Sequence, residues 1–210
     1  MSLLLHISAS PRGERSYSLR TATAFTDAYA KAHPDDTIRV LDLATATLPA
    51  FDAMAVSGKY RILHNESHTK EEATAWAAVE SVVEDFKSAD KLVVSSPMWN
   101  FGIPYRLKHY FDLVVQPGYT FSFSPETGYT GLMTDRPALL VLSRGGEYAA
   151  GTESEGYNQQ TPYLKLILGF MGFRSIETIV IEPTLMAGPD AARQKLDEAM
   201  ALAGSLAMTF

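Results

Sequence analysis

Residues 91–104 read KLVVSSPMWNFGIP, and this stretch carries the strongest indication of the fold. Its first half is a short, almost wholly apolar run over residues 91–94, which is typical of a strand buried on both faces. Its second half contains Pro97, Gly102 and Pro104, which are residues of loops and turns. The chain therefore leaves a core strand and at once places a thioether, an indole, an amide and a phenyl ring on a loop.

Strand-like runs recur along the chain on both sides of this stretch. Together with residues 92–95 they make five, the others lying at residues 3–7, 38–43, 137–142 and 176–181. Three of the five are apolar nearly throughout, and such runs favour a parallel sheet whose two faces are both covered.

Helical patterns separate these runs. Apolar side chains at helical spacing form two stripes, one of Leu19, Ala22, Phe25 and Tyr29 and one of Trp76, Val79, Val83 and Phe86. Residues 105–115, 158–171 and 191–203 also read as helices, residues 118–133 as a hairpin, and residues 44–69 as a long irregular or partly helical connection. The alternation predicts an α/β fold: a doubly wound, five-stranded parallel sheet with helices on both faces, in a single domain of residues 1–210.

Composition excludes several classes of function. With 46% hydrophobic and 20% charged residues the chain is globular, and its net charge of −6 argues against nucleic acid or an anionic membrane as the main partner. The absence of cysteine excludes disulfides, thiolate catalysis and iron–sulfur clusters. No apolar stretch approaches the roughly 20 residues of a membrane span, and the N-terminus lacks the features of a secretory signal. We therefore expect a cytoplasmic protein without a membrane span.

The loop after the first strand is rich in hydroxyl groups. In doubly wound sheets, ligands bind beyond the carboxyl ends of the strands, near the switch in strand order. Ser10, Ser16 and Ser18 fall in this loop, before a helix whose free N–H groups and dipole favour a phosphate. A plain turn with a serine N-cap explains the same residues. The sequence has no G-x-G-x-x-G and no G-x-x-x-x-G-K-[ST], so a monophosphate fits better than a dinucleotide or a nucleoside triphosphate.

The loop after the third strand could form the wall of a ligand site, and the loop after the fourth strand could supply hydrogen-bond donors. Residues 98–101 suit a flat ligand that is partly polar, although packing of the rings into the core is an equal alternative. Gly145 and Gly146, next to Arg144, can turn backbone N–H groups toward an acceptor, or simply form a turn. A ligand with a phosphate tail and a planar, polar head would touch all three loops. Flavin mononucleotide (FMN) has that shape, and donors at the two glycines would stabilise the negative charge of its reduced form near N1 and the C2 carbonyl.

Three motifs carry a resemblance to a known family. S-x-P-R…S-x-S, P-M-W-N-F-x-I-P and S-R-G-G, in this order and spacing, resemble the FMN-dependent NADH:quinone oxidoreductases, often called azoreductases. The resemblance spans nearly the whole chain and includes the aromatic hairpin. It implies a flavodoxin-like fold, a homodimer and one tightly bound FMN per subunit. It also implies two-electron, ping-pong transfer from NADH or NADPH through flavin N5 to quinones and azo compounds.

The resemblance also assigns roles to residues. The phosphate would be held by Ser10, Ser16, Tyr17 and Ser18; the isoalloxazine would be lined by Pro97, Met98, Trp99, Asn100 and Phe101; and its pyrimidine end would face Ser143, Arg144, Gly145 and Gly146. No side chain is expected to be catalytic, because the chemistry belongs to FMN, and no metal is expected. Two positions depart from the family: Trp99 stands where many members have tyrosine, and Tyr17 replaces a polar residue.

Several alternatives stay open at this level. The enzyme could instead be an NAD(P)H-dependent FMN reductase, or the chain a non-enzymatic electron carrier of the flavodoxin type, although its long connection and its hairpin suggest walls for a second substrate. Residues 163–171 are apolar nearly all round, which predicts contact with another subunit unless the helix is fully internal. His64 and His68 could share a helix face as metal ligands, but a solvated helix is the stronger interpretation, and His109 and Asp112 read as part of an ordinary charged helix face.

Overall fold

The central sheet has five parallel strands in the order β2-β1-β3-β6-β7, and the computed structural model describes residues 1–210. The strands are β1 (Leu3–Ser8), β2 (Thr37–Asp42), β3 (Lys91–Pro97), β6 (Ala138–Ser143) and β7 (Ile176–Ile181). From β1 the chain goes first to β2 on one side and later to β3 on the other, so the strand order switches between β1 and β3. The predicted five-stranded, doubly wound sheet is confirmed.

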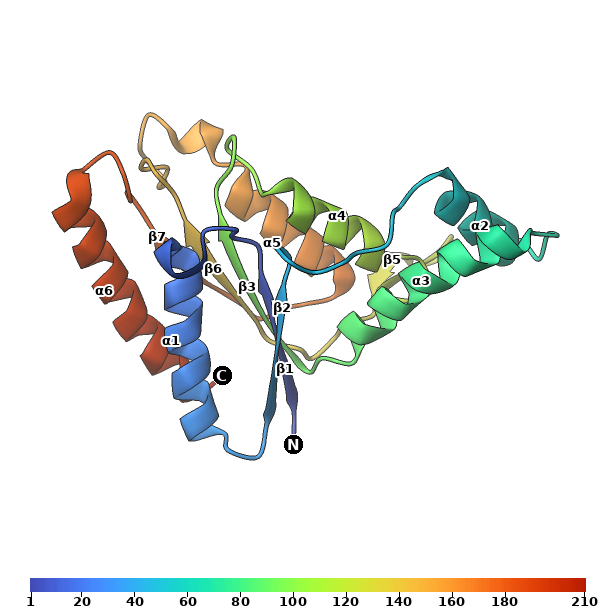
Figure 1. The fold of residues 1–210 in the computed structure, drawn as a ribbon, viewed down its shortest axis with the longest axis horizontal. Helices are drawn as coiled ribbons and strands as arrows, with labels where there is room; N and C mark the ends of the chain where they lie inside the picture. The colour runs from blue at the N-terminus through green and yellow to red at the C-terminus, as the bar shows by residue number, and fades with distance from the viewer.

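Helices cover both faces of this sheet, as Figure 1 shows. One face carries α1 (Tyr17–Ala32) and α6 (Gly188–Ala207), and the other carries α3 (Lys70–Lys87), α4 (Tyr105–Val114) and α5 (Gln160–Met171). Successive side chains of a strand point to opposite faces, so Leu4 packs in the cluster under α1 and α6, whereas Leu5 packs in the other. This is why the inner strands β1 and β6 are apolar at nearly every position.

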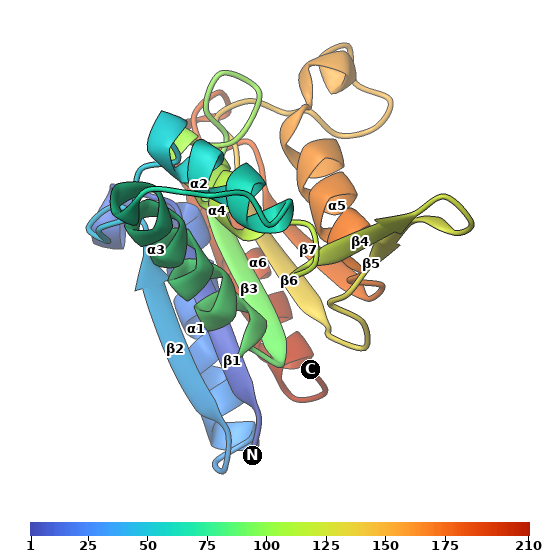
Figure 2. The ribbon, with the colours of Figure 1, turned by 90° about the vertical axis from the view of Figure 1, so that its right-hand side faces the viewer.

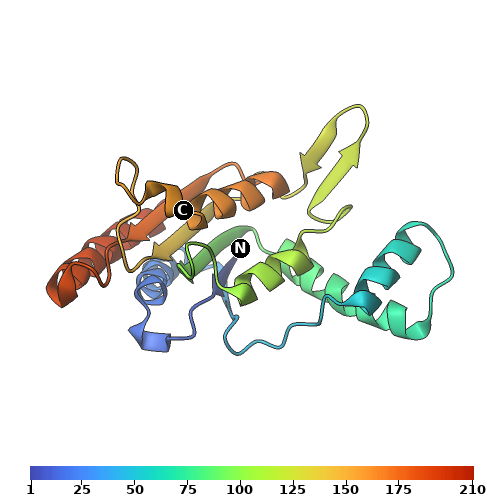
Figure 3. The same ribbon diagram turned by 90° about the horizontal axis from the view of Figure 1, so that it is seen from above.

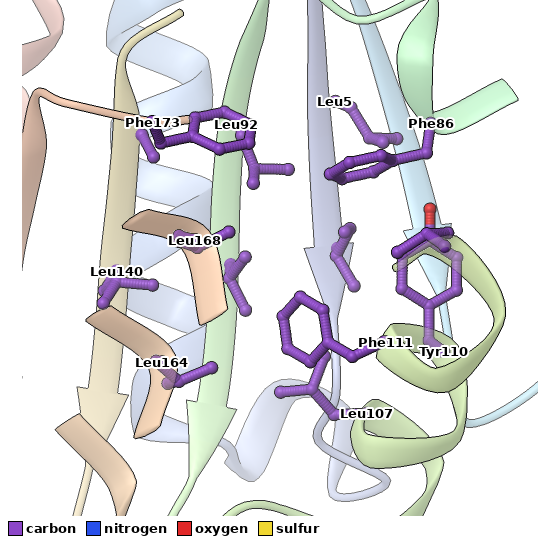
Figure 4. Close-up of a cluster of buried hydrophobic side chains, with 14 of the residues drawn as sticks. Leu5, Phe86, Leu92, Leu107, Tyr110, Phe111, Leu140, Leu164, Leu168 and Phe173 are labelled. Atoms are coloured by element: carbon purple, nitrogen blue, oxygen red, sulfur yellow. The ribbon is translucent and has the colours of Figure 1, made fainter. Parts of the chain in front are cut away.

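The largest of the three hydrophobic clusters lies beneath α3, α4 and α5 (Figure 4). Its labelled side chains come from the sheet, from all three helices and from the segment after α5: Leu5, Leu92 and Leu140 from strands, Phe86 from α3, Leu107, Tyr110 and Phe111 from α4, Leu164 and Leu168 from α5, and Phe173 from the segment before β7. All of them are buried. Two of the helices in this core, α4 and α5, directly follow loops in which ligand residues are predicted, so the core holds those loops in place.

Two additions project beyond the layers (Figures 2 and 3). The helix α2 (Ala53–Leu63) packs on α3, so closely that a Cβ on Gly58 would lie 2.4 Å from the carbonyl oxygen of Glu72. The hairpin of β4 (Phe121–Ser124) and β5 (Gly128–Gly131) stands at the end of α5, where a Cβ on Gly131 would lie 2.3 Å from the nitrogen of Gly172. The hairpin was predicted, and α2 gives a definite helix to a connection predicted as irregular or partly helical.

Local signals explain where the helices begin. Ser16 caps α1 by accepting a hydrogen bond from the N–H of Leu19, and Asp52 caps α2. Thr69 and Glu72 form a reciprocal capping box at α3. Two short 3₁₀ helices, η1 (Gly13–Arg15) and η2 (Glu155–Tyr157), precede α1 and α5. None of the helices combines the length and the apolar character that crossing a membrane requires.

Candidate functional site

The three predicted loops start side by side at the carboxyl end of the sheet. Two backbone hydrogen bonds join their first residues: the N–H of Ala9 donates to the carbonyl of Ser95 at 2.9 Å, and the N–H of Met98 donates to the carbonyl of Ser143 at 2.8 Å. Pro97, the last residue of β3, is paired with Ser143 of β6. The adjacency that was inferred from strand order is therefore present, and the loops form one continuous rim.

The loop after β1 gathers hydroxyl groups and free N–H groups. The Oγ atoms of Ser16 and Ser18 lie 3.2 Å apart, and Ser10 is buried with them. The backbone N–H groups of Tyr17 and Ser18 donate to no other group of the chain, as expected of the first turn of a helix. The ring of Tyr17 packs against the core under α1. This loop thus offers the donors of an anion site, with the helix dipole behind them.

The loop after β3 contains a tight two-residue turn. Trp99 and Gly102 exchange both backbone hydrogen bonds, at 3.1 and 2.9 Å. The residues between them, Asn100 and Phe101, have φ values of 47° and 68°. Positive φ at both central positions is the mark of a type I′ turn, which usually has glycine second. A phenylalanine in this backbone region is strained, and such strain is concentrated at functional sites.

The rings of this turn stand on the surface and not in the core. Trp99 is 40% exposed and Phe101 is 45% exposed, so the alternative of plain core packing is wrong. Phe101 stacks on Tyr157 with ring centroids 5.0 Å apart, and Tyr148 approaches it edge-on at 6.3 Å. The carbonyl of Phe101 also accepts the N–H of Gln159 at 3.0 Å. These contacts hold the strained residue in place.

A cavity of about 150 Å³ opens beside Trp99. It is lined by Ala9, Pro11, Leu43, Ala44, Trp99, Pro104, Tyr105 and Arg106. The guanidinium of Arg106 donates to the carbonyls of Leu43 and Ala46, and so ties the segment after β2 to α4. Lys108 and Asp112 form an exposed ion pair on that helix, in agreement with the charged face expected at Asp112. Arg106 is therefore a structural residue of the rim.

The loop after β6 presents two further unpaired donors. The N–H groups of Gly145 and Gly146 donate to no other group of the chain. Both positions are also crowded: a Cβ on Gly145 would lie 3.0 Å from Cδ1 of Leu185, and one on Gly146 would lie 2.8 Å from Sδ of Met186. Both contacts are to the ends of exposed side chains, which are free to move, so a residue other than glycine would displace these side chains next to the two N–H groups.

Arg144 points into the protein. Its guanidinium is buried and donates to Gln160 at 3.1 Å, to Glu182 at 3.2 Å and to the hydroxyl of Thr161. Burial lowers the pKa of Arg144, and the adjacent carboxylate of Glu182 opposes that shift. Arg144 was predicted at the pyrimidine end of a ligand, but its guanidinium is paired with side chains in the interior of the protein.

Sequence reasoning missed four residues that shape this rim, Tyr148, Tyr157, Gln160 and Glu182. Each lies outside the three predicted loops, and each meets them only in three dimensions. The sequence signal available was the strand β7, because the residue that follows a strand of this sheet also reaches the rim. That rule would have pointed to Glu182 and not to the others.

His6, His64 and His68 lie in three different environments. His6 is buried in β1, and its Nε2 lies 2.9 Å from Oγ of Ser95. Burial lowers the pKa of His6 to about 4, so the ring is neutral at pH 7. His64 follows the end of α2 and His68 lies in the loop before α3. These two do not share a helix face, so the pairing that a metal site needs is not formed.

Known proteins resemble this chain over nearly its whole length. The family described as having a flavodoxin-like fold matches residues 2–205. An FMN-dependent NADH:quinone oxidoreductase of Nitratidesulfovibrio vulgaris is 51% identical over 210 residues, which cover 100% of each chain. The chain belongs to this oxidoreductase family. A second FMN-dependent NADH:quinone oxidoreductase, from Desulfotalea psychrophila, is 45% identical over 185 residues, covering 88% of this chain and 87% of the relative.

Solved structures agree with this family. The azoreductase of Bacillus anthracis strain Sterne superimposes with a TM-score of 0.92 at 32% identity, and 100% of each chain is covered. An FMN-dependent NADH-azoreductase of Bacillus anthracis strain Ames Ancestor, solved in complex with FMN, gives a TM-score of 0.87 at 26% identity, covering 99% of this chain and 100% of the other. The resemblance of the three motifs to the quinone oxidoreductases is thus confirmed over the whole chain.

Proposed function

We propose that this protein is an FMN-dependent NADH:quinone oxidoreductase that also reduces azo compounds. The observation that carries the proposal is the rim itself. Free N–H donors at residues 17–18 and 145–146 stand on either side of an exposed aromatic turn. Family membership supports the same conclusion, since the relatives bear this activity in their names.

The residues of the rim fit FMN. A phosphate needs several donors at a site of positive potential, and the first turn of α1 supplies N–H groups and hydroxyls there. A planar ring system needs an apolar wall, and the surface rings of Trp99 and Phe101 supply one. Its pyrimidine edge needs donors, and Gly145 and Gly146 supply two. When bound, FMN accepts two electrons from NADH and passes them to a quinone or an azo group.

The chain's own part in the reaction is to bind the phosphate of FMN and to line its ring system. Tyr17 and Ser18 would hold the phosphate through N–H groups, and Ser10 and Ser16 would add hydroxyls. Pro97, Met98, Trp99, Asn100 and Phe101 would line the ring, and Ser143, Arg144, Gly145 and Gly146 would bound its far end. For Arg144 we assign the backbone and not the guanidinium, which is already paired. No side chain of the rim is assigned a catalytic proton transfer.

A homodimer in which each chain is a single domain of residues 1–210 is part of the proposal. On α5, Leu166 is 71% exposed while its neighbours Leu164 and Leu168 are buried, so the helix is not fully internal. Phe123 and Tyr129 of the projecting hairpin are also exposed. These side chains form an apolar surface that a second copy would cover. A cytoplasmic location belongs to the same proposal, because a chain without cysteine needs no oxidising compartment.

Anaerobic stopped-flow kinetics tests this function. The protein is loaded with FMN, mixed with NADH, and then mixed with a quinone or an azo dye. We expect the flavin absorption to bleach with NADH and to recover with either acceptor. A protein that binds no FMN would overturn the proposal. Recovery with free FMN and not with quinones would instead indicate an FMN reductase, and failure to react with NADH would indicate an electron carrier.

A further inference from the structure

A buried polar network lies behind the loop that follows β6. Its centre is Arg144, which is 3% exposed and contacts three side chains from two other segments. Gln160 and Thr161 come from the start of α5, and Glu182 comes directly after β7. Taking an ion pair out of water is costly, and apolar residues of similar size would often serve stability as well. A role beyond stability therefore has to be sought in what the network holds.

The network reaches two of the three loops of the rim. The amide Nε2 of Gln160 donates to the carbonyl of Ser96 at 3.2 Å, at the end of the strand that leads into the aromatic turn. The same carboxylate oxygen of Glu182 accepts from Arg144 at 3.2 Å and from the N–H of Tyr148 at 2.9 Å. One oxygen atom thus ties down both ends of residues 144–148, with Gly145 and Gly146 between them.

Backbone bonds complete the hold on this loop. The carbonyl of Arg144 accepts the N–H and the hydroxyl of Thr184, both at 2.9 Å. The carbonyl of Gly145 accepts the N–H groups of Leu185 at 3.0 Å and Met186 at 3.1 Å. In a trans peptide the C=O of one residue and the N–H of the next point in opposite directions. The N–H groups of Gly145 and Gly146 are therefore both directed away from residues 184–186.

We propose that Arg144, Gln160 and Glu182 are positioning residues that fix the direction of these two N–H groups, and that they thereby set the reduction potential of bound FMN. The inference rests on the proposed function. Donors that are held in place stabilise developing negative charge without reorganisation, and reduced flavin carries more negative charge than oxidised flavin. Because the charges of Arg144 and Glu182 offset each other, the effect works through the direction of the donors and not through net charge.

The first test is Arg144→Lys, which keeps the positive charge. A lysine ammonium cannot reproduce the planar fork that reaches Gln160, Thr161 and Glu182 together. In the variant, we expect the ratio of the affinity for reduced FMN to the affinity for oxidised FMN to fall about tenfold. For a two-electron couple, this fall makes the reduction potential of bound FMN about 30 mV more negative. Gln160→Leu removes one link without any change of charge and should shift the potential in the same direction by less.

The matched control is Arg136→Lys at the other end of β6. Arg136 is also an arginine that bridges the chain, since its Nη1 donates to the carbonyls of Lys87 and Ala89, both at 2.6 Å. Its replacement should lower stability and leave the potential of bound FMN unchanged. A second readout needs no flavin: in the full chain without FMN, Arg144→Lys should speed the hydrogen exchange of the Tyr148 amide, and Arg136→Lys should not.

The possible results separate the two proposals. Potentials that stay at the unaltered value in both network variants would overturn the positioning role, as would unchanged exchange at Tyr148. If Arg144→Lys does not fold, Gln160→Leu decides by the same two measurements. A failure of the unaltered protein to bind FMN would overturn the proposed function, and the role in setting a flavin potential would fall with it.

Discussion

The two ends of the central sheet differ in whether their polar groups are paired within the chain. At the amino end, Asp36 accepts hydrogen bonds from the N–H of Ser2 and the hydroxyl of Tyr29, both at 2.6 Å, and Asp90 accepts the N–H of Leu3 at 2.8 Å. At the carboxyl end, four N–H groups of residues 17, 18, 145 and 146 have no partner in the chain. The exposed rings and the strained turn are at this end as well.

This difference shows how one sheet divides stability from function. The amino end closes the fold, because each of these polar groups finds its partner within the chain. The carboxyl end keeps donors available, and it holds them in position by pairing the groups behind them. Substitutions at the amino end should therefore change the free energy of unfolding alone, whereas substitutions at the rim should change ligand affinity.

The largest effect is expected from removing two hydroxyls of the first loop. In Ser16→Ala/Ser18→Ala, two hydrogen bonds to a charged group are lost, each worth about 1.5–3 kcal/mol, so the Kd for FMN should rise at least about a hundredfold. Isothermal titration with FMN measures this. Loss of the cap at Ser16 also lowers stability, so the control is Thr69→Ala, which removes the cap of α3 away from the rim. Unchanged affinity in the double variant would refute the phosphate site.

The second effect is a dependence of stability on pH, set by His6 within β1 and, in stronger acid, by Asp36 at the amino end. Burial lowers the pKa of His6 from 6.5 to about 4, so between these values the unfolded chain binds a proton that the native chain does not. Stability should therefore fall as the pH falls from 6.5 to 4, by about 3 kcal/mol in total. Urea unfolding across this range measures the slope.

A variant isolates the contribution of His6 from that of the amino end. His6→Gln keeps an amide near Ser95 but does not titrate, so its slope between pH 6.5 and 4 should be flatter. Hydrogen bonds from Tyr29 and Ser2 lower the pKa of Asp36 below 3.8. The stability that ionised Asp36 contributes is therefore complete above pH 3.8 and is lost only at lower pH. An identical slope in His6→Gln would show that another group is responsible.

A smaller effect is expected at the amino end itself. Tyr29→Phe removes the hydroxyl that donates to Asp36, and it should cost roughly the contribution of one ordinary hydrogen bond. Affinity for FMN should not change, because this end of the sheet has no contact with the rim. Urea unfolding and an FMN titration on the same preparation test both statements. A weaker affinity would break the division between the two ends.

The smallest effect concerns the strained turn. Phe101→Gly and Phe101→Ala both remove the ring that stacks on Tyr157, but only glycine accepts a φ of 68° without strain. The glycine variant should be more stable than the alanine variant by about 1 kcal/mol. Urea unfolding of the pair measures the difference, and equal stabilities would show that the turn relaxes.

Most of the fold could be predicted from the sequence, because period and composition act locally. Four of the five strands lie within one residue of the patterns that indicated them, β3 ends two residues later than its pattern, and the hairpin strands lie inside the predicted residues 118–133. The helix α2 was indistinct because it is short and because its burial depends on contacts with α3, such as the close approach at Gly58. Its cap, Asp52, was a local signal that could have been used.

The site was predictable where its groups belong to the backbone of strand-end loops. Residues 17–18 and 145–146 carry free N–H groups as expected of such loops. The inward direction of Arg144 was not predictable, because Glu182 and Gln160 approach it from distant parts of the chain. The role of Arg106 was hidden in the same way, since its partners are carbonyls of another segment. A side chain's direction is decided by partners that local patterns do not reveal.

The two halves of the rim also differ in the length of chain that each requires. The Ser16–Ser18 contact spans two residues, whereas Arg144 reaches Glu182 over 38 residues and Gln160 reaches Ser96 over 64. Contacts of short sequence separation close first, because they lose the least chain entropy. On a chain emerging from the ribosome, the phosphate loop can close while the last strand is still being synthesised. The loop that would face the flavin ring can form only after β7 has joined the sheet. Binding of the cofactor is therefore a late event in the folding of each molecule.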